Sequence, residues 1–387
     1  MRLRKVSIIS YKNIHEATLL PSPKINCLIG PNGAGKTNVL DALFFLSFCR
    51  SATTTADAQV IRHGDDFFVL EGEYERQGGQ SDSICCSMKR GSRKHLKRNG
   101  KEYHRLSQHI GLLPLVMVSP SDTMLIAGGS DHRRRLMDMV IAQYDNTYID
   151  LLGRYNKALQ QRNTLLKAEE EPDVQLLDIY EQQMAETGEL VSSKRADLVR
   201  LLRPVFYDLY GRIAGSGESV TLDYESHCAQ QPLREALCAS RQRDRLLGFT
   251  TRGVHRDDLA MTLDGYPMKS EGSSGQNKTF VTALKLAQLD LITGVDSARA
   301  RLESAPTQAR LESAPTIPHS RPILLLDDIF DKLDSRRVER IMGIVAGERC
   351  GQIFITHTDR RHLTDILSVA HADYKLFNVA DGNVTTI

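Results

Sequence analysis

The sequence lacks several features that would assign a protein to a class at once. Its 387 residues contain no apolar run approaching the roughly 18 residues that a membrane helix needs. The net charge is only +2, so any nucleic-acid surface must be a local patch rather than a global excess of positive charge. The basic start, Met1–Lys5, is followed by an apolar run too short for a secretory signal. These absences favour a cytoplasmic protein without a membrane segment.

Cysteine spacing also excludes a class of site. The seven cysteines form no CxxC pair and show no spacing typical of metal ligands. Most of them lie in apolar stretches, which indicates free thiols in a reducing compartment. They are Cys27, Cys49, Cys85, Cys86, Cys228, Cys238 and Cys350.

The most informative segment that is present is a glycine-rich loop with the spacing GxxxxGKT. Its residues are Gly30, Pro31, Asn32, Gly33, Ala34, Gly35, Lys36 and Thr37. The apolar run 25–29 before it predicts a buried strand, and the segment from Asn38 to Leu43 after it predicts a helix. Strand, loop and helix in this order are the context of a P-loop, in which backbone N–H groups and the helix N-terminus bind phosphates. Lys36 can then reach the terminal phosphates, and Thr37 can offer a hydroxyl to Mg²⁺.

The rest of the chain changes its periodicity twice. Residues 1 to about 120 are rich in strand patterns, and Asn99-Gly100 predicts a hairpin turn. From Tyr148 onward, apolar residues recur at three- and four-residue steps, break at residues 169–173 and resume at Leu176. This pattern predicts two long antiparallel helices. Strand signals return after about residue 218, and a helix is expected at Thr279–Ile292.

A short duplication follows that helix. Residues 301–307 recur as residues 310–316, each copy with the sequence Arg-Leu-Glu-Ser-Ala-Pro-Thr. Two copies are too few for a solenoid, so we expect a local duplication inside an exposed loop.

An apolar strand near the C-terminus ends in two carboxylates, Asp327 and Asp328. A continuous aliphatic run predicts a strand buried on both faces, and ligands of α/β sheets bind at the carboxyl ends of such strands. Asp327 is expected to hold Mg²⁺, directly or through water, and Asp328 to orient or deprotonate the attacking water. Lys36 and Asp327 must therefore meet, although they lie far apart in the sequence.

Three further motifs fit the same site. Ser273, Gly275 and Gln276 precede a predicted helix, where they either form an anion site or simply cap the helix. Residues 331–334 follow the acidic strand with the pattern Asp-x-Leu-Asp. The next strand ends at His357, which is placed to sense a γ-phosphate.

The order of these motifs resembles the ABC-type ATPase heads of the SMC and RecF class. The similarity covers nearly the whole chain and is nearer to the RecF family, the bacterial recombination mediators. It is carried also by Leu40-Asp41-Ala42, by residues 119–122, 133–138 and 161–163, and by Gly253-Val254-His255-Arg256-Asp257-Asp258. The chain departs from the family pattern at Val254, at Asp41 and at Tyr11-Lys12-Asn13.

The resemblance implies an α/β fold, an ABC-type P-loop ATPase head with a mixed sheet and flanking helices. Residues 1–120 with 250–387 would form the head, and residues 121–249 an inserted antiparallel helical arm. ATP and Mg²⁺ would be the cofactors, with Lys36, Asp328 and His357 in catalysis and Thr37 and Asp327 on the metal. The P-loop residues, Asn38, Ser273, Gly275 and Gln276 would bind ATP.

The resemblance also implies partners. Two copies would sandwich ATP, with the Ser273 region of one facing the P-loop of the other. The dimer would clamp duplex or gapped DNA, hydrolyse ATP slowly with stimulation by DNA, and act with RecR and RecO type mediators in recombinase loading.

Local basic clusters are candidates for the DNA contact, although solvated surface charge explains them equally well. For the arginine triplet we favour structural ion pairing within the head. The clusters comprise Lys89, Arg90, Arg93, Lys94, Lys97, Arg98 and Lys101 around the hairpin, Arg133-Arg134-Arg135, and Arg241, Arg243 and Arg245.

Two alternatives stay open at this point. An ABC transporter ATPase would carry a fuller Leu-Ser-Gly-Gly-Gln signature and a glutamate after Asp327, whereas this chain has Asp328 there. A scaffold that binds ATP with negligible turnover is the second alternative, because aspartate is a shorter carboxylate than glutamate.

Overall fold

The computed structural model describes residues 1–76, 79–215, 217–303, 321–330, 333–347, 350–368 and 373–387. These residues form two compact units. The first consists of Met1–Asp122, Arg212–Gly215 and Lys278–Ile387, and the second of Thr123–Gly211 and Ser216–Asn277.

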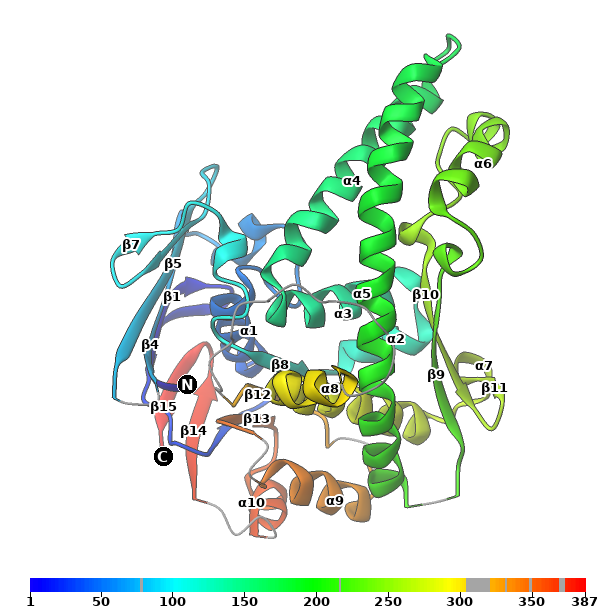
Figure 1. The fold of residues 1–387 in the computed structure, drawn as a ribbon. Helices are drawn as coiled ribbons and strands as arrows, with labels where there is room; N and C mark the ends of the chain where they lie inside the picture. The colour runs from blue at the N-terminus through cyan, green and yellow to red at the C-terminus, as the bar shows by residue number, and fades with distance from the viewer. Residues whose placement is uncertain (77–78, 216, 304–320, 331–332, 348–349, 369–372) are drawn as a thin grey trace. The chain divides into compact units, whose positions relative to one another are not determined.

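The first unit contains a six-stranded sheet in the order β15-β14-β3-β13-β12-β8. All neighbours in it pair in parallel except the terminal β14–β15 hairpin. Every residue of β3, β12 and β13 is buried, as expected for the central strands of a parallel sheet that is covered on both faces. Strands from opposite ends of the chain therefore lie side by side (Figure 1). The bounds are β3 Ile25–Ile29, β8 Leu115–Val118, β12 Ile323–Asp327, β13 Ile353–His357, β14 Tyr374–Ala380 and β15 Asn383–Thr386.

A second six-stranded sheet of this unit is antiparallel throughout, in the order β2-β1-β4-β5-β6-β7. The predicted hairpin turn is confirmed, since Asn99 and Gly100 join β6 to β7 with φ values of 52° and 77°. These left-handed conformations are the ones that Asn-Gly adopts in two-residue hairpin turns. The strands are β1 Arg2–Tyr11, β2 Ile14–Leu19, β4 Phe67–Glu75, β5 Ser81–Lys89, β6 His95–Arg98 and β7 Lys101–Glu102.

Helix α1 (Lys36–Phe48) contacts strands of both sheets, including β12 and β13 on one side and β4 and β5 on the other. Its burial between two sheets explains why it is apolar on nearly every face. Helix α8 (Ser274–Glu303) continues past its expected end at Ile292. The remaining helices of this unit are α9 Ser335–Val345 and α10 Arg360–Ser368, with short 3₁₀ turns η1 Asp57–Val60, η2 Leu106–Gln108 and η3 Pro120–Thr123.

The two predicted long helices are present in the second unit as α4 (Asn146–Lys167) and α5 (Val174–Ala214). They run antiparallel, since Arg162 of α4 bonds Glu181 of α5, while Asp145, just before α4, pairs with Lys194 farther along α5. A three-stranded sheet, β11-β10-β9, belongs to the same unit. The other elements are α2 Met124–Ala127, α3 Ser130–Tyr144, α6 Leu233–Leu247, α7 Met268–Glu271, β9 Val220–Glu225, β10 Asp258–Leu263, β11 Tyr266–Pro267, η4 His227–Ala229 and η5 Val254–Arg256.

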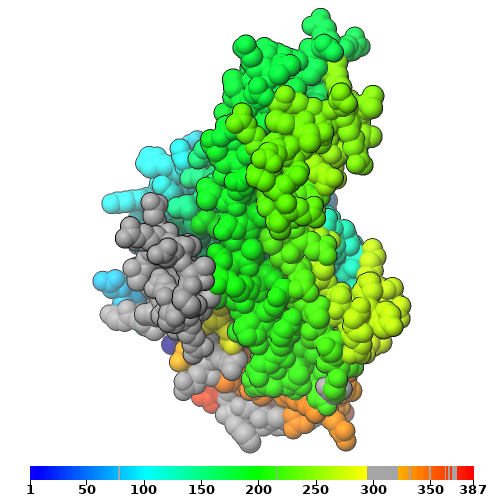
Figure 2. Space-filling view, turned by 45° about the vertical axis from the view of Figure 1, so that its right-hand side comes forward, coloured from blue at the N-terminus to red at the C-terminus, as the bar shows by residue number. Residues whose placement is uncertain are grey.

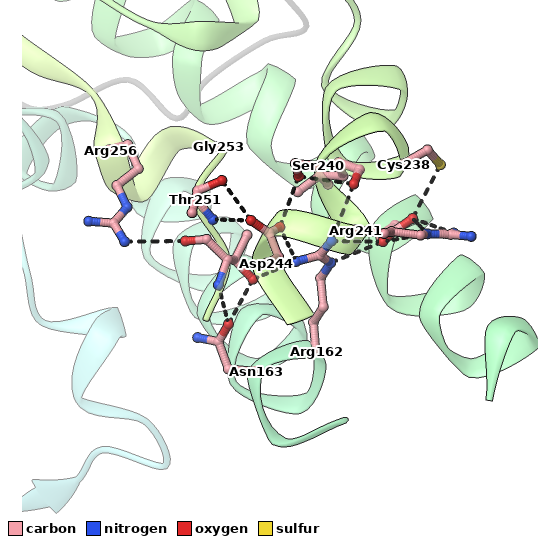
Figure 3. A network of polar contacts seen from close by, with 12 residues as sticks. Arg162, Asn163, Cys238, Ser240, Arg241, Asp244, Thr251, Gly253 and Arg256 are labelled. Atoms are coloured by element: carbon pink, nitrogen blue, oxygen red, sulfur yellow. Dashed lines mark hydrogen bonds and ion pairs between the residues drawn. The ribbon is translucent and has the colours of Figure 1, made fainter. Parts of the chain in front are cut away.

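A buried polar cluster, here called the arm network, joins α4, α5 and α6 (Figure 3). Its residues are Arg162, Glu181, Arg241 and Asp244. The Arg162 guanidinium lies 2.7 Å from Asp244 and 3.0 Å from Glu181, and all three side chains are fully buried. Arg241 adds further bonds to Glu181, so α6 is held against α5, a packing that Figure 2 shows from another side. Buried charges of this kind persist only when each has its partner.

The boundary between the two units differs from the predicted boundary at the C-terminal end of the arm. We expected the head to resume at residue 250, whereas residues 250–277 belong to the second unit. The physical reason is the antiparallel pairing of β10 with β9, which fixes this segment there. The duplicated segment lies largely outside the described residues, and its first three residues, Arg301–Glu303, still belong to α8.

In the described part of the chain, no helix is both long enough and apolar enough to cross a bilayer.

Candidate nucleotide-binding site

The glycine-rich loop connects β3 to α1, as the sequence predicts. Gly35 immediately precedes the helix with φ 114°, and a Cβ atom there would lie 2.7 Å from the Asn13 side chain. A Cβ on Gly30 would lie 2.0 Å from the Val379 carbonyl oxygen. Glycine is therefore required at both positions.

The loop is braced from two directions. Asn13, just after β1, donates from Nδ2 to the Ala34 carbonyl at 3.2 Å and accepts from Asn38 at 2.7 Å. From the other side, the Gly382 N–H in the β14–β15 turn donates to the same Ala34 carbonyl at 2.9 Å. In the sequence, Asn13 belongs only to a triplet that departs from the family pattern, and its hydrogen bonds to the loop and to Asn38 show this bracing role.

Lys36 is the first residue of α1, and its ammonium group lies inside the loop. It donates to the carbonyl oxygens of Gly30 at 2.7 Å and Pro31 at 2.9 Å. Burial lowers the pKa of Lys36, while the negative charges of Asp328 and Asp327 act in the opposite direction. The lysine is thus held close to the two aspartates and within the phosphate loop.

Thr37 and Asp327 bring the two ends of the chain together. The Thr37 hydroxyl lies 2.9 and 3.0 Å from the two carboxylate oxygens of Asp327, which ends β12. This contact confirms that the glycine loop and the acidic strand meet at one edge of the sheet. The donor set fits Mg²⁺, because carboxylate and hydroxyl oxygens are the ligands that this hard cation takes.

Asp328 follows directly, with φ 48°, a left-handed conformation that aspartate tolerates better than most side chains. Its N–H donates to the Thr356 hydroxyl at 2.9 Å, and the same hydroxyl lies 2.8 Å from Asp327 Oδ1. Burial raises the pKa of Asp327, and the hydrogen bonds from Thr356 and Thr37 oppose that rise. We refer to Thr37, Asp327, Asp328 and Thr356 as the strand-end cluster.

His357 ends β13 beside the start of the glycine loop, where its carbonyl accepts the Gly30 N–H at 3.4 Å. Its Nδ1 lies 2.9 Å from the Asp359 N–H. A ring nitrogen that accepts a hydrogen bond is unprotonated, so the neutral ring carries its proton on Nε2. That tautomer is the one needed to donate to a phosphate, and the role of His357 stays a prediction.

In the second unit, Ser273 and Gln276 form a reciprocal cap at the start of α8. The Ser273 hydroxyl accepts the Gln276 N–H at 3.2 Å, and Gln276 Oε1 accepts the Ser273 N–H at 2.8 Å. This is the capping-box arrangement, so the helix-cap alternative is realised. The cap occupies the Gln276 N–H, and nucleotide contact by Ser273, Gly275 and Gln276 stays a prediction.

The Asp-x-Leu-Asp pattern is only partly described. Asp334 accepts the Arg337 N–H at 3.0 Å and caps α9. Asp331 and Lys332 lie outside the described residues.

Several arginines of the basic clusters are engaged inside the protein. Arg133 makes a paired contact with Asp258 at 2.6 and 2.8 Å, which confirms ion pairing for this member of the triplet, although both residues belong to the second unit and not to the head. Arg241 belongs to the arm network, and Arg245 donates to the carbonyls of Leu165 and Glu169. On the hairpin, Lys94 and Arg98 pair with Asp57 and Asp82. The exposed residues of these clusters are Lys89, Arg90, Arg93, Lys97, Lys101, Arg135 and Arg243.

Comparison with known families gives a match over almost the whole chain. The family model described as the RecF/RecN/SMC N terminal domain matches residues 2–384. The DNA replication and repair protein RecF of Phocaeicola vulgatus is 51% identical over 385 residues, which cover 100% of this chain and 98% of that protein. RecF of Azobacteroides pseudotrichonymphae is 44% identical over 388 residues, which cover 100% of this chain and 100% of that protein.

Solved structures give the same picture. The recombination mediator protein RecF-ATPrS is 26% identical with a TM-score of 0.84, covering 100% of this chain and 98% of that one. The corresponding RecF-ATP structure is 25% identical with a TM-score of 0.83, covering 100% and 99%. The Smc head domain from Pyrococcus furiosus, at 14% identity and a TM-score of 0.56 with 100% and 96% covered, shares the fold alone.

Proposed function

Because this chain belongs to the RecF/RecN/SMC family and within it to the RecF proteins, we propose that it is an ATP-dependent DNA-binding protein of recombinational repair and replication. The observation that carries the proposal is the contact between Thr37 and Asp327, at 2.9 and 3.0 Å. It joins the phosphate loop to the acidic strand, as an ATPase requires. The family membership argues against the transporter alternative.

For the chemistry, we propose that Lys36 holds the terminal phosphates while Thr37 and Asp327 hold Mg²⁺, which when bound would neutralise charge on the phosphates. Asp328 would orient the attacking water, and His357 would donate from Nε2 to the γ-phosphate. Asp328 is a short carboxylate on a left-handed backbone, so we expect slow turnover. A scaffold with negligible turnover is the limit of this behaviour.

We further propose that ATP holds two copies together. The cap residues Ser273 and Ser274 are exposed at the start of a long helix, which leaves this N-terminus accessible to a phosphate presented by a second copy. Hydrolysis would remove the bridging charge and release the dimer. The dimer would act as a clamp on duplex or gapped DNA in the cytoplasm, with RecR and RecO type mediators as partners.

The test is to measure ATP hydrolysis and oligomeric state together, with and without duplex DNA, at two salt concentrations. We expect ATP to drive dimerisation and DNA to stimulate hydrolysis, with less stimulation at high salt. A Lys36→Arg variant separates turnover from binding, because it keeps the charge and changes the geometry. If the parent dimerises with ATP and turnover is undetectable at every DNA concentration, the scaffold function replaces the ATPase.

The sandwich geometry has a separate test. Ser273→Arg places a bulky cation at the cap and should abolish dimerisation while ATP still binds to the monomer. Lys269→Arg, a change on the neighbouring helix α7 that keeps the charge, serves as the control. Normal dimerisation of the Ser273→Arg variant would count heavily against the sandwich.

A further inference from the structure

Thr356 occupies a position that the proposed roles above leave unassigned. It lies on β13, directly opposite Asp327 of β12 in the parallel register, and it is fully buried. Its hydroxyl makes two contacts at once. It donates to Asp327 Oδ1 at 2.8 Å and accepts the N–H of Asp328 at 2.9 Å. One side chain thus contacts both acidic residues at the strand end.

We propose that Thr356 is a positioning residue of the nucleotide site, whose hydroxyl fixes the orientation of the Asp327 carboxylate and the backbone conformation of Asp328. The inference rests on the proposed function, because it assigns to Asp327 and Asp328 the roles of metal ligand and water-orienting group. Thr356 itself touches neither metal nor nucleotide in this assignment.

The chemistry of the side chain narrows the choice at this position. A hydroxyl is a single group that donates one hydrogen bond and accepts others, which the two contacts of Thr356 require. Valine has the same shape and can do neither. Serine keeps both contacts, although it lacks the methyl group that restricts χ1 of threonine on a strand.

Thr37 cannot take over the orientation of Asp327. Its hydroxyl carries one proton, so it cannot donate fully to both carboxylate oxygens that lie 2.9 and 3.0 Å away. It is also a metal ligand in the proposed site, and a cation would draw on its oxygen lone pair. Thr356 approaches from the neighbouring strand, so its contact with Asp327 does not depend on the state of the phosphate loop.

The contact with Asp328 acts on the backbone. A non-glycine residue at φ 48° is in a conformation that L side chains adopt rarely, and it persists when its surroundings hold it. The bond from the Asp328 N–H to Thr356 is a specific restraint of that kind. Without it the peptide is free to rotate, and the carboxylate of Asp328 changes direction relative to Asp327.

The experiment compares Thr356→Val with Thr356→Ser in the full-length chain. A fluorescent ATP analogue is titrated first in EDTA and then at fixed nucleotide with increasing Mg²⁺, and kcat and KM for ATP are measured separately. Ser47→Ala is the matched control, because the Ser47 hydroxyl is also buried and donates to the Leu113 carbonyl at 2.6 Å, at the far end of α1.

We expect the valine variant to bind nucleotide in EDTA within about twofold of the parent, because the phosphate loop is intact. Its half-saturating Mg²⁺ concentration should rise by about 10-fold or more, the usual effect of losing a group that orients a metal ligand. Its kcat should fall more than its KM changes. The serine variant should restore the parental Mg²⁺ response, and Ser47→Ala should leave it unchanged.

An unchanged Mg²⁺ half-saturation in Thr356→Val would overturn the inference, as would equal defects in the valine and serine variants. If the valine variant does not fold, the serine variant decides, since a raised Mg²⁺ requirement there contradicts a role carried by the hydroxyl. A parent protein that binds no nucleotide overturns the proposed function itself. The two failures are therefore told apart by the parent titration.

Discussion

The arm network and the strand-end cluster differ in how their charged side chains are partnered. In the arm, the Arg162 guanidinium meets Glu181 and Asp244, and all of these side chains are fully buried. At the strand end, the Asp327 carboxylate accepts from the hydroxyls of Thr37 and Thr356. The nearby Lys36 turns to loop carbonyls instead. A structural network neutralises its charges internally, whereas a ligand site keeps them available for a partner from outside.

The largest expected effect is the loss of stability caused by a substitution in the arm network. Arg162→Met leaves Asp244 buried without its cation and leaves Glu181 with Arg241 as its remaining cation, so the free energy of unfolding should fall by about 3–5 kcal/mol. Urea unfolding followed by far-UV circular dichroism measures it. Arg243→Met on the exposed face of α6 should change stability by less than about 0.5 kcal/mol. Equal effects of the two changes would show that the arm network contributes little.

A substitution in the strand-end cluster should lower ATP turnover and leave the free energy of unfolding nearly unchanged. Asp328→Asn keeps a side chain that tolerates φ 48° and removes the negative charge, so ATP turnover should fall by about 100-fold while nucleotide binding stays. Steady-state phosphate release and equilibrium binding measure the two quantities. Asp381→Asn, at φ 47° in the β14–β15 turn, is the control and should be near the parent. A large stability loss in Asp328→Asn would remove the contrast between the regions.

The buried His255 of the second unit predicts that the stability of the protein depends on pH. Burial lowers the pKa of His255 to about 4 from 6.5, and the neighbouring cations, chief among them Arg256, add to the shift. The unfolded chain then binds a proton near its ordinary pKa and the folded chain does not. The contribution of His255 to the free energy of unfolding is therefore fully present above pH 6.5 and is lost as the pH falls toward about 4. About 2 kcal/mol of it is lost at pH 5.

Denaturation of the parent and of His255→Gln at several pH values isolates this contribution. The variant keeps a polar side chain at a position that contacts Tyr155 and the Thr250 carbonyl. The stability difference between the two proteins should shrink as the pH is lowered from about 7.5 to 5. A difference that stays constant would mean that His255 titrates alike in both states.

The smallest effect is expected for the exposed hairpin. Replacing Lys97 and Lys101 by glutamine should weaken duplex DNA binding a few-fold and reduce the slope of log K against log salt by about 2. Fluorescence anisotropy at several salt concentrations measures the slope. Arg243→Gln, an equally exposed cation of the arm, is the comparison. If it lowers the slope as much as a hairpin lysine, DNA contact extends to the arm.

The parts of the site that are formed by consecutive residues could be predicted from the sequence. The glycine loop, the aliphatic strand before Asp327 and the strand ending at His357 carry their own patterns, and all lie where expected. Asn13 and Thr356 could not be assigned, because their roles come from neighbours in other elements, the glycine loop for Asn13 and strand β12 for Thr356. Register between distant strands is invisible in a single sequence.

The same reason explains the misplaced boundary at residue 250. The segment 258–263 has an ordinary strand pattern, and only its pairing with residues 220–225 assigns it to the second unit. Arginine clusters were ambiguous for a related reason. The pattern of Arg241 and Arg245 is that of a basic surface, yet hydrogen bonds to Glu181 and to the Leu165 carbonyl hold these half-buried side chains against the protein.

The position of β3 has a consequence for how the protein is made. This strand precedes the phosphate loop near the start of the chain, yet both of its neighbours in the sheet, β13 and β14, come from the last segment of the sequence. During synthesis the ribosome delivers β3 long before the strands that flank it. The nascent chain must therefore keep an apolar strand unpaired until β13 and β14 have been made, which exposes it to misfolding and aggregation during synthesis.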